Sequence, residues 1–545
     1  MKKRLSAILL ILALLFALAA CGNGGDGTTA PGTSTAPGTS TAPGTSTAPG
    51  TSTAPGTSTA PGTEARYMDS INILTEQPLN VLDTQHPAGT GSSNRTIYSM
   101  VFNKLFNIVE GEYIPELATS WEISDDLLTY TFKLREDVTF SNGDKFNAQS
   151  VIDTFDMARA APGTEAFDVW RTVDNLRAID EYTLEINQGV VDVDVMFRLS
   201  LPWAGILNKR AIEADNLEGR WVGTGPYTIT DFVAGDYTEL TRRDDYWGGQ
   251  PPTRVVTFRW VPETTARTVM MRNGEAQLNR NTAPEDMHYF LNDPENFDVI
   301  TITANVANTI MFNMNHPICS DKNFRLAVAH ALSLPEIAMT AGGVWEVPVT
   351  DGTVWGAGTE FRHNDLPLFE YNLDLSKQYL DASVYNGEEL ELVASSVSML
   401  RAIEMIQEQL GMAGIRVRLY PTDTPTLSSY AVYENNQAEM IHFLNSFDLN
   451  ASSARNVFYP GRSTNRASYN NPVVTELLDR APTVADVRER EAMYRQVQEI
   501  VYDDMPYISL YYSTRIVVAQ AGIGGIILNQ DMNHDFKFIS IPDRS

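Results

Sequence analysis

Alternating hydrophobic and polar positions predict short β-strands along much of the chain. Between residues 221 and 249, two alternating runs at 227–232 and 237–242 flank a turn at 234–236 that contains Gly235. Two alternating runs joined by a short loop with glycine are typical of a β-hairpin. The same alternation predicts a strand at 129–135, followed by a turn, and a further strand is predicted at 309–315. Asn147 is predicted to cap a helix that begins at Ala148.

Other segments repeat their apolar residues at helical spacing. Residues 92–109 carry apolar side chains three and four positions apart, as do residues 321–332 and 399–410, and this spacing marks one face of a helix. The third segment lies between strand patterns at 389–394 and 415–420. A strand–helix–strand alternation favours a sheet with helical crossovers, so we predict an α/β fold.

The N-terminus has the pattern of a targeting signal. Three basic residues precede an apolar stretch at 7–20, which is shorter than the roughly 20 residues that a spanning helix needs. The stretch ends in Leu18, Ala19, Ala20 and Cys21, which resembles the lipobox of bacterial lipoproteins. That resemblance implies that residues 1–20 are cleaved and that Cys21 carries a lipid anchor. The alternative is a plain secretory signal with an incidental cysteine.

The segment 21–65 is predicted to be a disordered tether. The unit TAPGTS recurs, with a proline at every sixth position and almost nothing apolar to bury. Such a sequence favours extended, polyproline-like conformations, with a reach on the order of 120 Å at about 3.1 Å per residue. Its Ser, Thr and Pro content permits O-glycosylation. A long spacer is most useful beneath a thick wall, so we expect a Gram-positive envelope, or the periplasm in a Gram-negative host.

Composition excludes some classes of protein. The 545-residue chain has a formal charge of −28, which repels nucleic-acid backbones and anionic lipid headgroups. Its second cysteine, Cys319, has no partner for a disulfide once Cys21 is lipidated. Roughly 480 residues remain after the tether, enough for two or three domains with substantial cores.

Four blocks in order along the chain resemble one family. They are PELATSWE with TYTFKLR at 115–135, GTGPY with GDY and YWGG at 223–249, the helix at 321–332 with Arg325, and the charged helix at 487–502. These blocks resemble the family 5 extracellular solute-binding proteins, the oligopeptide-, dipeptide- and nickel-binding receptors of ABC importers. Departures occur at Gln149 and Gln277, where the family usually carries an acidic residue.

The resemblance implies a periplasmic-binding-protein-like α/β fold with two lobes, an extra inserted domain and a hinged cleft. Residues 66–305 and 505–545 are expected to form lobe I, with an inserted subdomain at about 110–220. Residues 306–504 are expected to form lobe II. The chain is expected to cross between the lobes near Ala304 and again near Asp504.

Signatures of enzymes are missing from the sequence. It contains no HExxH, no Walker-type glycine-rich loop, no GxSxG and no CxxC. We therefore expect no catalytic residues, no cofactor and no metal site. The histidines are scattered singly, which disfavours a nickel cage built from protein ligands alone; they are His86, His288, His316, His330, His363, His442 and His534.

Candidate ligand contacts follow from the resemblance and from aromatic loops. In peptide-binding relatives, an aspartate binds the α-ammonium group of the peptide and lies in a short motif. The counterpart of that motif here is 442–450, in which Phe443 occupies the position of the motif's tryptophan and Ser446 the position of its first acidic residue. A shift of two residues would give that role to Asp448, beside Phe447; otherwise Asp448 is a solvated loop acid. Aromatic side chains on a glycine-rich loop often bind ligands, and an arginine there suits a carboxylate. The remaining candidates are Ser92, Ser93, Trp345, Trp355, Phe361 and Arg362.

The sequence thus predicts a monomeric, lipid-anchored receptor on the extracellular face of the membrane. It would capture an oligopeptide or dipeptide between closing lobes and deliver it to an ABC permease. Three alternatives remain open: a surface-tethered hydrolase, a signalling or adhesion receptor without transport, and the same receptor fold for sugars or metal chelates.

Overall fold

The computed structural model describes residues 69–541, apart from 90–91, 110–111, 396–399, 434 and 531–533. The predicted signal peptide, the lipidation at Cys21 and the predicted tether lie outside these residues. Within the described ranges, no helix has both the length and the apolar character needed to cross a membrane.

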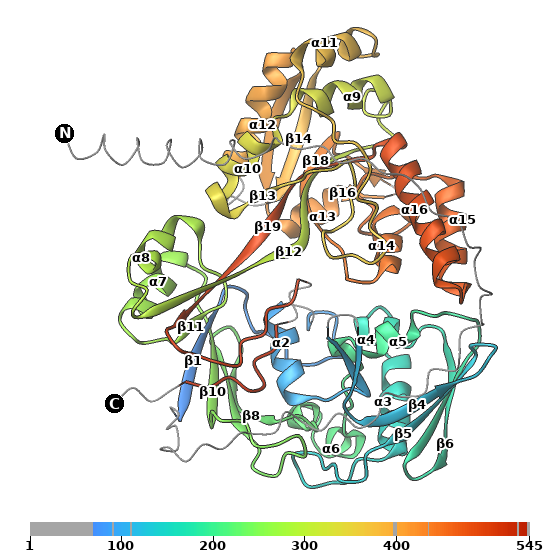
Figure 1. Ribbon diagram of the computed structural model, residues 1–545, viewed down its shortest axis with the longest axis vertical. Helices are drawn as coiled ribbons and strands as arrows, with labels where there is room; N and C mark the ends of the chain where they lie inside the picture. The colour runs from blue at the N-terminus through green and yellow to red at the C-terminus, as the bar shows by residue number, and fades with distance from the viewer. Residues whose placement is uncertain are drawn as a thin grey trace, which may run out of the picture. The chain divides into compact units, whose positions relative to one another are not determined.

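One mixed sheet of eleven described strands organises the chain, in the order β15-β14-β18-β12-β19-β11-β1-β10-β9-β8, with β13 paired to β19 (Figure 1). We call β8, β9, β10, β1 and β11 the first half-sheet, and β18, β14 and β15 the second half-sheet. The strands are β1 (Ser70–Thr75), β8 (Tyr227–Val233), β9 (Tyr237–Arg242), β10 (Val255–Trp260), β11 (Leu278–Asn279), β12 (Phe297–Phe312), β13 (Val347–Pro348), β14 (Glu389–Ser395), β15 (Arg416–Thr422), β18 (Met440–Ser446) and β19 (Tyr507–Gln520).

Two long antiparallel strands, β12 and β19, join the half-sheets and run side by side in Figure 1. Their pairing extends from Phe297↔Gln520 to Met311↔Tyr507, with the register interrupted between Thr303 and Ala307. The sequence predicted only the second part of β12, at 309–315. In β19, Thr514 pairs with Thr303, and Asp504 is the last residue of the helix α16 (Val487–Asp504) that precedes β19.

The predicted hairpin at 227–242 is confirmed as β8 and β9, paired from Tyr227↔Arg242 to Val233↔Tyr237. The preceding glycines have a steric role. A Cβ atom on Gly223 would lie 2.1 Å from the Val101 carbonyl oxygen, and one on Gly225 would lie 2.5 Å from that of Met100. Glycine is therefore required where this loop packs on the end of helix α2 (Ser92–Val101).

The residues between α2 and β8, numbers 102–226, form what we call the inserted segment. It contains an antiparallel sheet in the order β4-β5-β7-β6 and a separate β2–β3 hairpin. The buried members of its hydrophobic cluster, which include Phe132 and Trp170, lie between Leu105 and Ile206, and partly buried Trp247 packs against them from outside the segment. Its strands are β2 (Phe106–Val109), β3 (Glu112–Pro115), β4 (Ala118–Ile123), β5 (Thr129–Leu134), β6 (Val173–Asp180) and β7 (Thr183–Gln188).

The first long helix of the inserted segment starts where the sequence predicts. Asn147 Oδ1 accepts a hydrogen bond from Ser150 N, and Ser150 Oγ accepts one from Asn147 N, both at 3.3 Å. This reciprocal pair is a capping box. The inserted segment holds α3 (Ala148–Arg159), α4 (Glu165–Val169), α5 (Val195–Leu199) and α6 (Lys209–Ala214).

Helices cover both faces of the second half-sheet. Phe312 and Met440 pack in a cluster with residues of α9, α10 and α12, whereas Met311 and Ile441 pack in a second cluster with residues of α14, α15 and α16 (Figure 1). The helices outside the inserted segment, besides α2, are α7 (Thr264–Arg272), α8 (Met287–Leu291), α9 (Lys322–Ala331), α10 (Leu334–Gly342), α11 (Leu373–Asp381), α12 (Leu400–Ala413), α13 (Thr424–Tyr430), α14 (Ala454–Phe458), α15 (Pro472–Arg480) and α16 (Val487–Asp504).

Candidate functional site

A cavity of about 510 Å³ is bounded by three separate parts of the chain. One wall comes from α2 and the inserted segment, a second from loops that follow β13 and β18 together with the start of α16, and a third from the C-terminal residues 527–537. Volumes of this size are typical of sites for small organic ligands.

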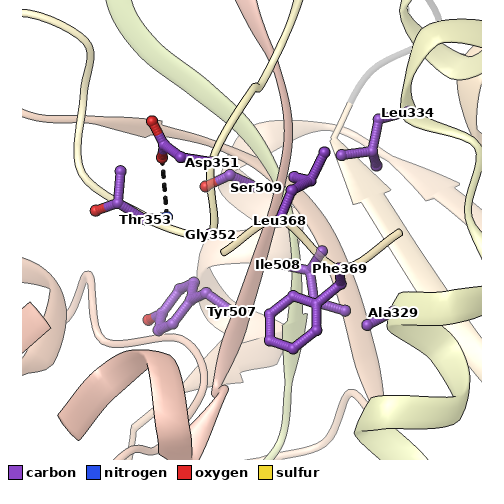
Figure 2. Close-up of a pocket in the computed structure, with 10 residues that line it drawn as sticks. All are labelled: Ala329, Leu334, Asp351, Gly352, Thr353, Leu368, Phe369, Tyr507, Ile508 and Ser509. Atoms are coloured by element: carbon purple, nitrogen blue, oxygen red, sulfur yellow. Dashed lines mark hydrogen bonds between the residues drawn. The ribbon is translucent and has the colours of Figure 1, made fainter. Parts of the chain in front are cut away.

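A second pocket lies in the interior beside β19 and is shown in Figure 2. Its volume is about 10 Å³, which leaves room for roughly one water molecule. The Asp351 carboxylate at its edge already accepts a hydrogen bond from Thr353 N at 3.0 Å. This pocket is too small for a solute, so the larger cavity is the candidate binding site.

Asp194 is the most buried carboxylate in the wall of the larger cavity. It immediately precedes α5 and is only 4% exposed. Its Oδ1 accepts a hydrogen bond from Asn450 Nδ2 at 3.1 Å, whereas its Oδ2 has no hydrogen-bond partner among the described residues. Burial, together with the nearby Asp192 carboxylate, raises the pKa of Asp194.

Glu360 is a second carboxylate of the cavity and lies in the loop after β13, on the second wall. Its Oε2 lies 3.4 Å from the same Asn450 Nδ2 that donates to Asp194. Burial raises the pKa of the Glu360 carboxyl, and Asp194 adds to that effect while Arg490 opposes it. One amide thus holds two carboxylates close to each other.

Two buried lysines, Lys104 and Lys537, also line the cavity. Lys104 Nζ donates hydrogen bonds to Asn107 Oδ1 at 3.0 Å and to the Ser200 carbonyl oxygen at 2.5 Å. Lys537 Nζ lies 2.8 Å from Glu116 Oε1. Burial alone would raise the pKa of the Glu116 carboxyl, but the two lysines outweigh it and hold that pKa below its usual range. The cavity wall therefore combines carboxylates with lysines, and Lys537 Nζ also lies 3.6 Å from Oδ2 of Asp535, another residue of the wall.

A family model for "Bacterial extracellular solute-binding proteins, family 5 Middle" matches residues 112–469. The chain belongs to this family. It is 23% identical over 493 residues to the peptide transport periplasmic protein SapA of Salmonella typhimurium, covering 83% of this chain and 88% of SapA. It is 22% identical over 485 residues to the nickel-binding periplasmic protein of Escherichia coli, covering 82% and 91%.

The fold agrees with that of solved family 5 structures. The ABC transporter substrate-binding protein CtaP of Listeria monocytogenes superposes with a TM-score of 0.79 at 22% identity, covering 88% of this chain and 100% of CtaP. The predicted periplasmic-binding-protein-like, two-lobed α/β fold is thereby confirmed.

Two of the aromatic residues that we predicted as ligand contacts in this family 5 protein lie in its interior. Trp355 is fully buried, with its ring centroid 6.3 Å from that of Phe447 and 5.8 Å from that of Tyr494. Phe447 is 2% exposed. Both belong to the cluster under α16 and are absent from the cavity wall.

Phe361 and Arg362 are held by neighbours of their own. The Phe361 ring stacks on Tyr494, with centroids 5.9 Å apart. Arg362 Nη1 lies 2.8 Å from Asp351 Oδ2, and its Nη2 donates to Tyr512 Oη at 2.9 Å. The structure thus engages the Arg362 guanidinium with a carboxylate of the protein itself.

Among the remaining predicted contacts, Ser93, Trp345 and Asp448 lie outside the described lining of the cavity. Ser92 begins α2, and buried Ser93 accepts a hydrogen bond from Arg280 Nη1 at 2.8 Å. Trp345 packs, partly buried, on a cluster beside α7 and α8. Asp448 is partly buried, and its backbone oxygen accepts from Thr359 Oγ1 at 3.2 Å. The two residues after it, Leu449 and Asn450, do line the cavity.

The sequence did not single out five polar residues of the cavity wall: Lys104, Asp194, Glu360, Asn450 and Lys537. Apart from Asn450, none of these five lies in a motif that the sequence showed, and all five lie outside the long helices and strands. The nearest signal was the segment 442–450, which ends at Asn450. Among the described residues, no group of three or more His, Cys, Asp or Glu side chains is arranged to hold a metal ion.

Proposed function

We propose that this family 5 protein captures a short peptide in the 510 Å³ cavity and delivers it to an ABC permease. The observation that carries the proposal is the cavity itself, which draws its walls from both sides of the β12–β19 connection and presents both carboxylates and basic side chains. A peptide is zwitterionic and presents one charge of each sign at its ends. Such a ligand suits a site that offers groups of both charges.

The names of the relatives support this assignment. SapA of Salmonella typhimurium is a peptide transport protein, and CtaP is a substrate-binding protein of an ABC transporter. We infer a binding protein rather than an enzyme, acting as a monomer, with Cys21 as the lipid anchor and residues 21–65 as the tether. We place the protein at the outer face of the membrane. We assign the closing of the two lobes on the ligand to a hinge motion about the β12–β19 connection.

A metal chelate is the second candidate ligand, because a nickel-binding protein is among the relatives. Such a ligand would bring its own organic donors to the cavity. It would therefore need few protein ligands to the metal.

The assignment is tested by native mass spectrometry of the protein purified without refolding, followed by calorimetric titration with defined peptides. We expect a co-purifying mass that fragments as a short peptide, and stabilisation of the protein by added peptide according to its affinity. A co-purified nickel complex or sugar, with no binding of any peptide, would overturn the peptide assignment. Turnover of the bound peptide would instead favour a hydrolase.

A further inference from the structure

Trp345 reaches from one half-sheet to the other. It lies between β13 and α10, a helix that packs on the second half-sheet. Its partly buried side chain packs instead on a cluster that includes Leu74 of β1 and Phe290 of α8. Since β1 belongs to the first half-sheet, Trp345 is a contact between the two half-sheets outside the β12–β19 connection.

This contact lies on the face of the first half-sheet that is turned away from the cavity. Leu74 and Val518 belong to the cluster beneath Trp345, whereas their neighbours Ile73 and Val517 pack with residues of α2. Neighbouring residues of a strand point to opposite faces of a sheet, and α2 contributes to the cavity wall. In Figure 1, α7, α8 and α10 lie on one side of the long strands β12 and β19, and α4, α5 and α14 lie on the other.

The segment that carries Trp345 is fixed to β19 near the middle of the connection. Glu346, the next residue, accepts hydrogen bonds from the side chain of Ser513 and the backbone of Thr514. Thr514 pairs with Thr303, where the register between β12 and β19 is interrupted. Gly342 lies against Glu346, because a Cβ atom there would be 2.7 Å from Glu346 Cγ. Trp345 therefore sits close to the place about which the half-sheets would rotate.

Apolar side chains are exposed on both sides of the Trp345 contact. On the side of the second half-sheet, Val344 is 79% exposed and Met339 of α10 is 58% exposed. On the side of the first half-sheet, Val269 of α7 and Leu291 of α8 are 47% and 52% exposed. Covering such side chains is favourable, because it removes apolar surface from water.

The two sides of the cavity touch each other in this structure. Asn450 Nδ2 donates to Asp194 Oδ1 at 3.1 Å, and Val193 N donates to the Pro482 carbonyl oxygen at 2.9 Å. Both contacts join the inserted segment to loops of the second half-sheet, so the cavity is closed here. A rotation about the β12–β19 connection that separates these surfaces brings the surfaces behind the connection together. Opening the cavity therefore moves Val344 and α10 toward α7 and α8.

We propose that Val344 and Trp345 form an apolar contact with α7 and α8 that grows as the cavity opens, stabilises the open arrangement and lowers the affinity for the ligand. The inference rests on the proposed function, since it takes the ligand to be bound between the closed sides of the cavity. The apparent affinity of such a ligand falls with the fraction of protein that is closed. Trp345 lies outside the described lining of the cavity, so it is a positioning residue and not a ligand contact.

Electron–electron resonance distances in the full-length protein test the proposal. Nitroxide labels at Asp125→Cys in the inserted segment and Arg488→Cys in α16 use two exposed positions on the two sides of the cavity. Cys319 should stay unlabelled, because it is buried and burial raises the pKa of its thiol to about 12. We expect the ligand-free wild type to populate a longer and a shorter distance, and added Ala-Ala-Ala to favour the shorter one.

Variants behind the connection should shift this balance without touching the ligand. Val344→Ser and Val269→Ser should each lower the ratio of open to closed protein about threefold, and should tighten the binding of Ala-Ala-Ala by a similar factor. Val384→Ser changes another exposed valine, in the segment that follows α11, and should behave as the wild type. Trp345→Ala should bind Ala-Ala-Ala more tightly although it unfolds at a lower temperature. A merely structural role of Trp345 would instead weaken both.

The outcomes separate the two proposals. A single short distance in the ligand-free wild type, an unchanged distance ratio in both valine variants, or weaker binding by Trp345→Ala would overturn the contact behind the connection and leave the peptide receptor standing. Shifted distances in the variants, with no binding of Ala-Ala-Ala or of any other defined peptide, would overturn the peptide assignment and leave the contact standing.

Discussion

Replacing His442 by leucine should remove an acid sensitivity that is built into the second half-sheet. His442 lies in β18, is fully buried, and has no hydrogen-bond partner at either ring nitrogen among the described residues. Burial lowers the pKa of the His442 imidazole from 6.5 to about 4. The folded protein therefore keeps this ring neutral at pH values where the unfolded chain protonates it.

The sign and size of the effect follow from linkage. The unfolded chain takes up the proton below pH 6.5, whereas the folded protein does so only near pH 4. Stability that is present above pH 6.5 is therefore lost as the pH falls toward 4. The loss is about 3 kcal/mol, because one pKa unit corresponds to ~1.4 kcal/mol.

Urea denaturation of the wild type and of His442→Leu at pH 7, 5 and 4 measures this loss. The difference in unfolding free energy between the two proteins should shift in favour of the variant by about 3 kcal/mol between pH 7 and pH 4. Exposed His288→Gln is the control and should follow the wild type. A His442→Leu curve that runs parallel to the wild type at all three pH values would refute the reasoning.

Three further changes have defined outcomes. Burial raises the pKa of Glu346 to about 7, so the folded protein loses stability as the pH rises from 4.5 to 7. Urea titration should show that Glu346→Gln is more stable than the wild type by up to about 3 kcal/mol at pH 8 and equally stable at pH 4. An equal increase in stability at both pH values would contradict this prediction. Trp355→Ala should cost about 3–5 kcal/mol of stability, whereas Trp355→Phe should leave peptide affinity unchanged; a tenfold weaker affinity in stably folded Trp355→Phe would make Trp355 a ligand contact. Cys21→Ser should move the protein from the membrane fraction to the soluble fraction, and retention in the membrane would exclude the lipid anchor.

The sequence predicted elements whose signals are local. The β8–β9 hairpin alternates on both sides of Gly235, and α3 starts at a capping residue, Asn147, so a few neighbouring residues determine each structure. The first part of β12 was missed, and the alternation of residues 297–303 is broken where Val299 and Ile300 adjoin. Its partner strand β19 lies more than 200 residues away, and that pairing has no local signal.

The cavity was harder to predict because its residues meet only through the fold. Asp194 and Asn450 are 256 positions apart and lie outside any periodic pattern. Trp355 illustrates the opposite difficulty, since a tryptophan in a glycine-rich stretch looks like an exposed loop residue. The structure folds that stretch inward and places the ring between Phe447 and Tyr494.

The ends of the inserted segment lie next to each other. Gly225 N donates to the Val101 carbonyl oxygen at 2.8 Å, and Asn103 N donates to Thr224 Oγ1 at 3.2 Å. A segment with its own hydrophobic core and adjoining ends behaves as an exchangeable cassette. Gain, loss or replacement of such a cassette requires only a short splice between α2 and β8. Lys104 and Asp194 both belong to the inserted segment. One splice would therefore exchange a whole wall of the cavity while the eleven-stranded sheet stayed the same. The range of captured solutes can thus diversify independently of that sheet.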